Sequence, residues 1–262
     1  MLLENKNAIV YGAGGSIGSA VARTFAAEGA SVFLVGRNRA NLEQAATEIS
    51  AAGGRAEVAV FDALDEQAVD DHVEAVVAAA GSVDISFNLV TRGDVQGTPL
   101  IELSTADFLR PITTGVTANF VSARAAGRQM VKQGSGVILA LDSGSAHASP
   151  MMGGTGAADA ATDTLVRALA MELGPQGVRV LGIWTAGIPE TLSPEKLALV
   201  NKDLQLDAAA FQGLLGQLDQ MRMLRRSPRL AEVTSAAAFL ASDRASAITG
   251  TFVNVSSGTF AS

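Results

Sequence analysis

The chain has 262 residues, of which 48% are hydrophobic and 17% charged, so it is long enough to bury the core of one large globular domain. It contains no cysteine and only two histidines, which excludes disulfides, thiolate chemistry and a histidine-rich metal centre, and we expect no metal site. Its net charge of −7 argues against nucleic acid or an anionic membrane surface as the main partner, while a single anionic cofactor remains compatible with it.

The first residues lack the basic segment followed by an apolar run that marks a signal peptide. No uninterrupted apolar run reaches the length needed to cross a membrane. We therefore expect a cytoplasmic protein whose partner is a small-molecule substrate.

A glycine-dense turn follows the first predicted strand. The apolar run at residues 8–11 predicts a short buried strand, and Ile17, Val21 and Phe25 recur every four residues, which predicts that a helix begins at the turn. Glycines let a backbone approach a phosphate closely, and a helix N-terminus offers unpaired N–H groups and the positive end of its dipole. The pattern predicts a nucleotide site, and the alternative is a tight turn that binds nothing. The residues expected to contact the nucleotide here are Gly12, Gly14, Gly15, Ser16, Ile17 and Gly18.

Strand-like and helix-like segments alternate through the rest of the chain, which predicts a parallel sheet with helices on both faces. No linker or low-complexity tract divides the chain, so we expect one domain spanning residues 1–262. The further predicted strands are residues 31–35, 58–61, 85–90, 137–141, 178–184 and 252–255, which makes about seven in all. The further predicted helices are residues 41–52, 65–80, 113–130, 159–173 and 230–240.

Some helix boundaries carry capping signals. Ser104 and Asp107 have a spacing like that of a capping box, and the pairs Ser193-Pro194 and Ser227-Pro228 place a cap residue before a proline, as helix starts prefer. Residues 188–226 alternate least regularly between strand and helix. Because ligands of a doubly wound sheet bind beyond the carboxyl ends of its strands, we expect this segment to form a substrate lid. The alternative is an additional helical pair packed on the core.

The glycine turn resembles that of the short-chain dehydrogenase/reductase family. Gly12-x-x-x-Ser16-x-Gly18 follows the family's Gly-x-x-x-Gly-x-Gly spacing, with a serine at the middle glycine. Further matches cover nearly the full chain and include Asp62, Asn88, Thr185-Ala186, Ser242-Asp243, Ile248-Thr249-Gly250 and Val255-Ser256-Ser257-Gly258. The resemblance implies a Rossmann-type doubly wound α/β fold and a nicotinamide dinucleotide cofactor. It also implies that Asp62 contacts the adenine ring and that the cofactor lies along Ala63, Asn88, Leu89, Val90, Thr185 and Ile188.

The catalytic pattern departs from this family. Its reductases use a serine, a Tyr-x-x-x-Lys motif further along the chain, and an asparagine in the preceding long helix. Ser143 fits the serine, but Thr155 stands at the tyrosine position and Asp159 at the lysine position. A register shifted by one residue gives Gly156 and Ala160, so neither register supplies tyrosine or lysine. Gly115 replaces the asparagine, the single tyrosine is Tyr11 in the first strand, and the lysines are Lys6, Lys132, Lys196 and Lys202, none near this segment in the sequence.

Hydride transfer to a carbonyl still requires a proton, from a general acid or a water relay. Asp159 could supply it if burial favoured its protonated form, and the alternatives are His147 and a water held by Thr155. Without the lysine we expect no fixed positive charge at this place, which should make simple ketone reduction slow. The same edge of the sheet should also carry Asp142, Arg92 and Asp94.

The end of the second predicted strand favours NADP(H) over NAD(H). An NAD site places an acid there for the ribose 2′-hydroxyl, whereas Gly36 is uncharged and Arg37 can make charge-assisted contacts to a 2′-phosphate. The leading hypothesis is an NADP-dependent oxidoreductase with an altered catalytic set of Ser143, Thr155 and Asp159, acting on a carbonyl, enone or imine. The alternatives are a catalytically inactive NADP-binding sensor or partner subunit, and a non-redox lyase or isomerase.

The helices predicted at residues 113–130 and 159–173 are rich in alanine, and small residues such as Gly115, Ala118 and Gly127 allow close helix approach. The family resemblance implies that these helices pair in tetramers, and the C-terminal strand is apolar enough to join a second interface. We expect a homotetramer with two-fold axes, with a dimer as the second choice.

Overall fold

The structure, a computed structural model, describes residues 1–147 and 149–261. Its centre is a seven-stranded sheet of order β3-β2-β1-β4-β5-β6-β7, and each neighbouring pair of strands is parallel. The order reverses between β1 and β4, which is the switch point where doubly wound sheets bind ligands. The predicted fold class is therefore confirmed. The strands are β1 (Asn7–Tyr11), β2 (Ser31–Gly36), β3 (Arg55–Val60), β4 (Ile85–Asn88), β5 (Gly136–Asp142), β6 (Val178–Trp184) and β7 (Phe252–Asn254).

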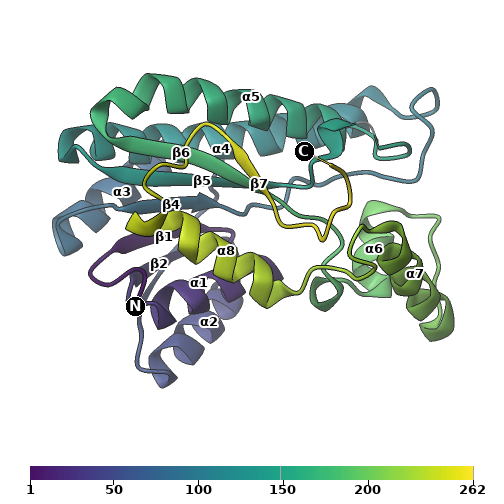
Figure 1. Ribbon diagram of the computed structural model, residues 1–262, viewed down its shortest axis with the longest axis horizontal. Helices are drawn as coiled ribbons and strands as arrows, with labels where there is room; N and C mark the ends of the chain where they lie inside the picture. Colours follow the sequence, from purple (N-terminus) through teal and green to yellow (C-terminus); the bar gives the residue numbers. More distant parts are fainter. Residues whose placement is uncertain (148, 262) are drawn as a thin grey trace.

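Two helical layers cover the sheet (Figure 1). Buried side chains of α1, α2 and α8 form one core cluster with one face of the sheet, and those of α3, α4 and α5 form a second cluster with the other face. Strands such as β1 are buried over their whole length because both faces are covered, which explains their continuous apolar sequence. The layers contain α1 (Ser16–Ala27), α2 (Arg39–Ala51), α3 (Glu66–Ala80), α4 (Thr105–Gln133), α5 (Thr155–Leu173) and α8 (Leu230–Ala241).

Residues 188–226 contain two helices, α6 (Pro194–Val200) and α7 (Ala208–Met221), which lie apart from both helical layers, on the right of Figure 1. Ser193 caps α6 as predicted, because its side chain accepts a hydrogen bond from the N–H of Lys196 at 3.3 Å. Neither helix buries a residue completely. The segment does not form an extra helical pair packed on the core, and its role as a lid stays a prediction.

Two predicted boundaries differ from the structure. The long helix predicted at residues 113–130 begins earlier, at Thr105 of α4, and Pro111 lies inside it. Its start directly follows Ser104, the residue with the predicted capping signal. The prediction that Ser227-Pro228 starts a helix is wrong. Both the N–H and the hydroxyl of Ser227 bond to Asp219 Oδ1, at 2.7 and 2.6 Å, so this serine ties the end of α7 instead of capping α8, which begins at Leu230.

Within the part of the chain that the structure describes, no helix is long and apolar enough to cross a membrane.

Candidate functional site

The glycine turn between β1 and α1 folds so tightly that side chains are excluded from two positions. A Cβ on Gly12 would overlap the carbonyl of Leu89 in the chain after β4, and a Cβ on Gly18 would overlap the carbonyl of Gly12. Gly12 also has a φ of 76°, which favours glycine. Gly15 caps α1 without a side chain, so the first N–H groups of the helix face the turn. This cradle fits the diphosphate of a dinucleotide.

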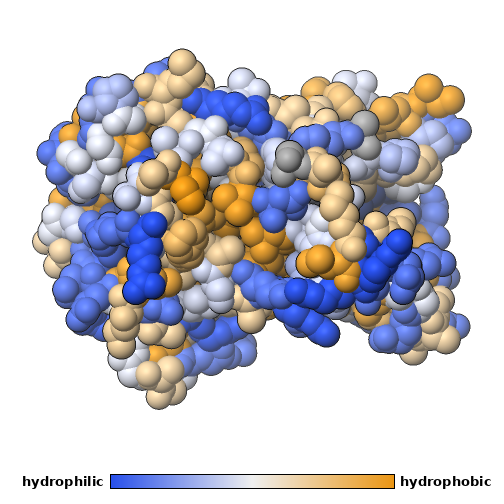
Figure 2. Space-filling view, viewed as in Figure 1, coloured by the Kyte–Doolittle hydropathy of each residue, from blue (hydrophilic) through white to orange (hydrophobic). Residues whose placement is uncertain are grey.

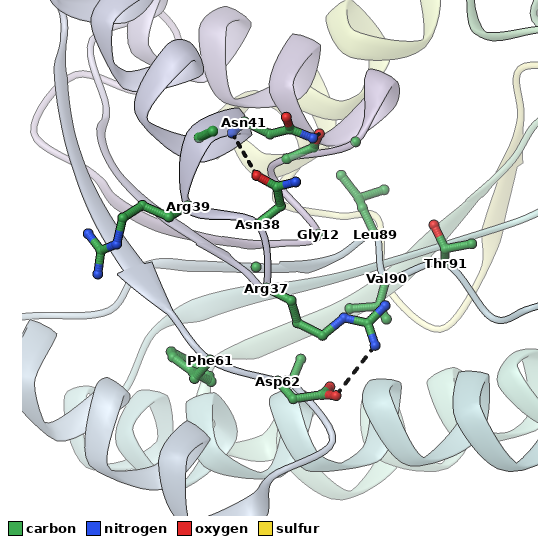
Figure 3. A pocket seen from close by; sticks show the side chains of 15 residues that line it. Gly12, Arg37, Asn38, Arg39, Asn41, Phe61, Asp62, Leu89, Val90 and Thr91 are labelled. Atoms are coloured by element: carbon green, nitrogen blue, oxygen red, sulfur yellow. Dashed lines mark hydrogen bonds and ion pairs between the residues drawn. The ribbon is translucent and has the colours of Figure 1, made fainter.

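A cavity of about 660 Å³ opens beside the glycine turn, at the carboxyl ends of β1, β2, β3 and β4 (Figure 3). Its position matches the switch point of the sheet. Nine of the predicted cofactor residues line it: Gly12, Gly14, Gly15, Gly36, Arg37, Asp62, Ala63, Leu89 and Val90. The sequence prediction missed Asn38, Arg39, Ala40, Asn41, Phe61 and Thr91, which line it as well.

Charge at one side of the cavity comes from arginine side chains at the end of β2. Figure 3 shows the guanidinium of Arg37 directed at Asp62, and the two groups are 3.7 Å apart. The Arg37 side chain is 76% exposed, so this ion pair contributes little and leaves the guanidinium free to contact an anion. Arg39 adds a second guanidinium, which pairs with Glu43 at 3.3 Å.

The sequence analysis did not predict the cavity residues on the α2 side, because they cap α2 or hold the glycine turn and do not belong to the glycine pattern itself. Asn38 caps α2 by accepting a hydrogen bond from the N–H of Asn41 at 3.1 Å. The Asn41 side chain in turn donates to the carbonyl of Gly14 at 3.3 Å, which fixes the glycine turn against α2. The available signal was an asparagine two residues after the end of β2, as this residue type favours N-caps.

The other predicted cofactor residues lie outside this cavity. Thr185 donates to the carbonyl of Val255 at 2.9 Å, and Ile188 packs in the core cluster beneath α1 and α8. Their contacts with a cofactor stay predictions. Outside the cavity lie Ser16, Ile17, Gly18, Asn88, Thr185 and Ile188.

A second cluster of polar side chains forms where β5 ends. Ser143 directly follows β5, and its hydroxyl donates to Asp159 Oδ2 at 2.7 Å. Asp159 projects from the first turns of α5, is fully buried, and also accepts the N–H of Ser145 at 2.8 Å. The Ser143 and Ser145 hydroxyl oxygens are 2.6 Å apart. The structure thus brings together two of the three predicted catalytic residues, and Ala160 of the alternative register is exposed.

A fixed positive charge stands in this cluster, contrary to the prediction. Arg92, in the chain after β4, places Nη1 2.5 Å from Asp159 Oδ1. Its side chain runs across Gly115 of α4, where an added Cβ would come within 2.5 Å of Arg92 Cδ. The glycine at the family's asparagine position therefore makes room for the arginine. In the family the cation is a lysine on α5, whereas here it comes from Arg92 in the chain after β4. The sequence analysis placed Arg92 at this edge of the sheet but did not predict its ion pair with Asp159.

Thr155 is connected to the same network indirectly, through Asp94. Its hydroxyl donates to Asp94 Oδ1 at 2.8 Å, and Asp94 lies 3.4 Å from the guanidinium of Arg92. Thr155 is 1% exposed, and its only hydroxyl proton is committed to Asp94. This geometry does not favour Thr155 as the group that holds a proton-donating water.

Two further carboxyl groups lie behind Asp159. Asp142 at the end of β5 accepts the N–H of Gly144 at 2.8 Å, and the indole N–H of Trp184 donates to Asp163 of α5 at 3.1 Å. Burial, with the nearby charge of Asp159, raises the pKa of Asp142 to about 8. Burial also raises the pKa of Asp163.

The raised pKa of Asp142 has a consequence for stability. Between the ordinary aspartate pKa of about 3.9 and the folded value of about 8, the folded chain keeps a proton that the unfolded chain has lost. This contribution to stability is complete below the lower pKa and is lost as the pH rises through the upper one. We expect the melting temperature to fall between about pH 5 and pH 8, and to fall less in Asp142→Asn. Thermal melts measure this, with Asp203→Asn on an exposed loop as the control that keeps the full decrease.

The remaining titratable candidates are not part of the network. His147 stacks on Phe260 with ring centroids 4.8 Å apart, and its Nδ1 lies 3.1 Å from the carbonyl of Gly144. Tyr11 lies in β1 as predicted, and burial raises its pKa above the usual range. Within the described residues, neither side chain is hydrogen-bonded to Ser143 or Asp159.

Comparison with known proteins defines the class. A family model described as enoyl-(acyl carrier protein) reductase matches residues 12–259. The 7alpha-hydroxysteroid dehydrogenase of Escherichia coli (strain K12) is 31% identical over 98% of this chain and 94% of its own. The gluconate 5-dehydrogenase of Gluconobacter oxydans (strain 621H) is 30% identical over 98% of this chain and 95% of its own. The chain belongs to the short-chain dehydrogenase/reductase family and is an oxidoreductase of that type.

Solved structures agree with this assignment. An NAD+-bound xylitol dehydrogenase superposes with a TM-score of 0.87 at 27% identity, over 98% of this chain and all of its own. A 7 alpha-hydroxysteroid dehydrogenase complexed with NADH and 7-oxo glycochenodeoxycholic acid gives a TM-score of 0.81 at 30% identity, over 98% of this chain and 94% of its own.

Proposed function

We propose that the protein is an NADP(H)-dependent oxidoreductase whose proton-transfer group is a hydrogen-bonded serine and aspartate, Ser143 and Asp159, in place of tyrosine and lysine. The observation that carries the proposal is the network of Ser143, Asp159 and Arg92 at the end of β5. It stands at the sheet edge where the family performs hydride transfer.

The residues of the cavity fit a dinucleotide. Gly12 and Gly18 keep the turn free of side chains, and the N-terminus of α1 supplies unpaired N–H groups for a diphosphate. When bound, the nicotinamide ring exchanges a hydride with the substrate. The chain's own residues must then position the substrate oxygen and move its proton.

The hydrogen bonds around Ser143 indicate how that proton moves. Asp159 receives donors from Arg92, Ser143 and the Ser145 backbone, which is the pattern that a carboxylate accepts. Ser143 donates its own proton to Asp159, so its free lone pair can take a proton from a substrate hydroxyl while its proton passes to Asp159. This arrangement is prepared for the oxidation of an alcohol.

In the reverse direction Ser143 can donate to a substrate only after Asp159 has been protonated. Simple ketone reduction should therefore be slow, and an activated enone or imine, whose carbanion or amine takes its proton from water, is the favoured acceptor. The test is turnover of NADPH with carbonyl, enone and imine panels, and of NADP+ with secondary alcohols. Cofactor binding at micromolar affinity without any turnover would favour the second candidate function, a dinucleotide-binding sensor or partner subunit, which the missing tyrosine and lysine support.

Arg37 is expected to select NADPH over NADH. An arginine at the end of β2 can make charge-assisted hydrogen bonds to the 2′-phosphate, and Gly36 places no acid there to repel it. The two solved relatives above hold NAD+ and NADH, so this choice depends on the chain's own residues. We expect Arg37→Ala to weaken NADPH binding by on the order of 10-fold and to leave NADH binding nearly unchanged, measured by fluorescence titration.

Arg55→Ala is the matched control, because Arg55 lies at the start of β3, lines no part of the cavity, and donates to the Ser31 hydroxyl at 2.8 Å. Equal affinity of the wild type for the two cofactors, or an unchanged NADPH preference in Arg37→Ala, would contradict the assignment.

We also propose a homotetramer with two-fold axes. On α4 and α5, Phe120 and Met171 are 44% and 81% exposed, and a largely apolar groove of about 590 Å³ lies between the two helices. Figure 2 shows a second apolar area on the visible face, between α8 and β7. Phe239 of α8 is 41% exposed. Two such patches support two distinct interfaces.

Light scattering at micromolar concentration is expected to give four times the 26.7 kDa chain mass. Phe120→Asp should reduce this to a dimer, because a charge would be buried in the α4–α5 interface. A monomeric wild type would overturn the proposal.

A further inference from the structure

Lys196 of α6 contacts the end of the glycine turn between β1 and α1, although the two segments are far apart in the sequence. Lys196 Nζ donates to Ser16 Oγ at 2.8 Å and to the carbonyl of Thr191 at 3.2 Å. Ser16 is the first residue of α1 and stands where the family's turn has its middle glycine. The side chain that makes this turn unusual is therefore the one that Lys196 contacts, across 180 residues of sequence.

The charges around Lys196 are unbalanced. Among the residues described, no carboxylate lies within ion-pair distance of its ammonium group, which has only two neutral oxygens as partners. The first turn of α1 contains no acidic residue, and its N-cap, Gly15, supplies no side chain. A lysine beside a helix N-terminus places a cation against the positive end of the helix dipole, which is unfavourable by itself.

An anion bound between Lys196 and the N-terminus of α1 would replace this repulsion by attraction on both sides. The N–H groups of α1, the Ser16 hydroxyl and the Lys196 ammonium would then all be donors to the same group. The position is next to Gly14 and Gly15, which line the cofactor cavity, and away from Arg37 at the other end of that cavity. An anion here is therefore distinct from the 2′-phosphate.

We propose that Lys196 binds the diphosphate of the dinucleotide and thereby fastens the α6–α7 segment over the bound cofactor. The inference rests on the proposed function, because it requires a dinucleotide in the cavity. It assigns to one lysine two linked effects, which are higher affinity for the cofactor and ordering of the lid when the cofactor binds. The diphosphate is common to NADPH and NADH, so the contribution of Lys196 is the same for both.

The experiment measures the dissociation constants of NADPH, NADH and ADP-ribose for Lys196→Met at low ionic strength. We expect all three to rise by a common factor on the order of 10, and the affinity to depend less steeply on salt than in the wild type. Lys196→Arg, which keeps the charge, should recover most of the affinity. Lys202→Met, in the loop after α6, is the matched control and should bind as the wild type does.

Hydrogen exchange supplies the second readout. NADPH should slow exchange in residues 194–221 of the wild type and Lys202→Met, and should slow it little in Lys196→Met. The contact that Lys196 makes is exposed, so the variant should fold, and a thermal melt confirms this. Unchanged affinities in Lys196→Met, or a loss confined to NADPH, would overturn the inference while leaving the proposed function standing. A wild type that binds neither dinucleotide would overturn both.

Discussion

Ser143→Ala is expected to lower turnover by on the order of 100-fold or more, because the hydroxyl that we propose contacts the substrate oxygen is also the link to Asp159. The residue directly follows β5 and is only partly buried, so its loss should cost little stability. The measurement is kcat and KM on a substrate found in the panels, with the thermal melt as a check on folding. A fall in kcat with an unchanged melting temperature is the expected pattern.

Ser145→Ala is the matched control. This serine is 2.6 Å from Ser143 Oγ, but its contact with Asp159 comes from the backbone N–H, which alanine keeps. We expect it to retain most of the activity. Asp159→Asn should change the pH dependence of kcat/KM, because the amide cannot take up the proton that Ser143 passes on. Wild-type rates and pH dependence in both Ser143→Ala and Asp159→Asn would show that the site is assigned wrongly.

Arg92→Met is expected to be the most destabilising of the substitutions considered. It leaves the fully buried Asp159 without its cation, and breaking a buried ion pair by removing one partner typically costs about 3–5 kcal/mol. For a domain of this size that corresponds to a fall in melting temperature of roughly 6–20 °C. Methionine keeps much of the volume that the arginine stem fills over Gly115, so the loss reports charge rather than a cavity.

The double variant Arg92→Met with Asp159→Asn separates the explanations. If the cost comes from an uncompensated carboxylate, the neutral amide should restore much of the stability, and the two substitutions should be strongly non-additive. Additive losses in urea or thermal unfolding would mean that Arg92 stabilises the chain through packing alone.

The parts of the molecule that sequence reasoning predicted are those specified by neighbouring residues. The strand, glycine turn and helix at residues 8–25 carry their periodicity and their glycines within a few turns of chain, and the structure has each element there. The parallel pairing of the strands then follows from the alternation of strands and helices, because parallel strands need crossovers. Ser227 shows the limit of this reasoning. The Ser193-Pro194 pair starts α6, whereas the Ser227-Pro228 pair starts no helix, because the Ser227 side chain bonds to Asp219 of α7.

The charges of the site could not be predicted in this way. Arg92 and Asp159 are 67 residues apart and come from different elements, and nothing in either local sequence names the other as its partner. The available signal was indirect: a glycine at position 115, where the family has a larger side chain, leaves space for something long. Lys196 lies far from the Thr155–Asp159 segment in the sequence, and its contact with Ser16 of α1, 180 residues away, has no local signal either.

The arginine lying across Gly115 also limits how this chain could return to the ordinary chemistry of its family. Thr155→Tyr together with Asp159→Lys would recreate the missing motif on paper, but the new lysine would meet the guanidinium of Arg92 at the place where the carboxylate now stands. Removing Arg92 would in turn open a gap above Gly115. An active reversion therefore needs at least four coordinated changes, with Arg92 and Gly115 among them, and each partial combination leaves like charges facing one another, an unpaired carboxylate or an unfilled space.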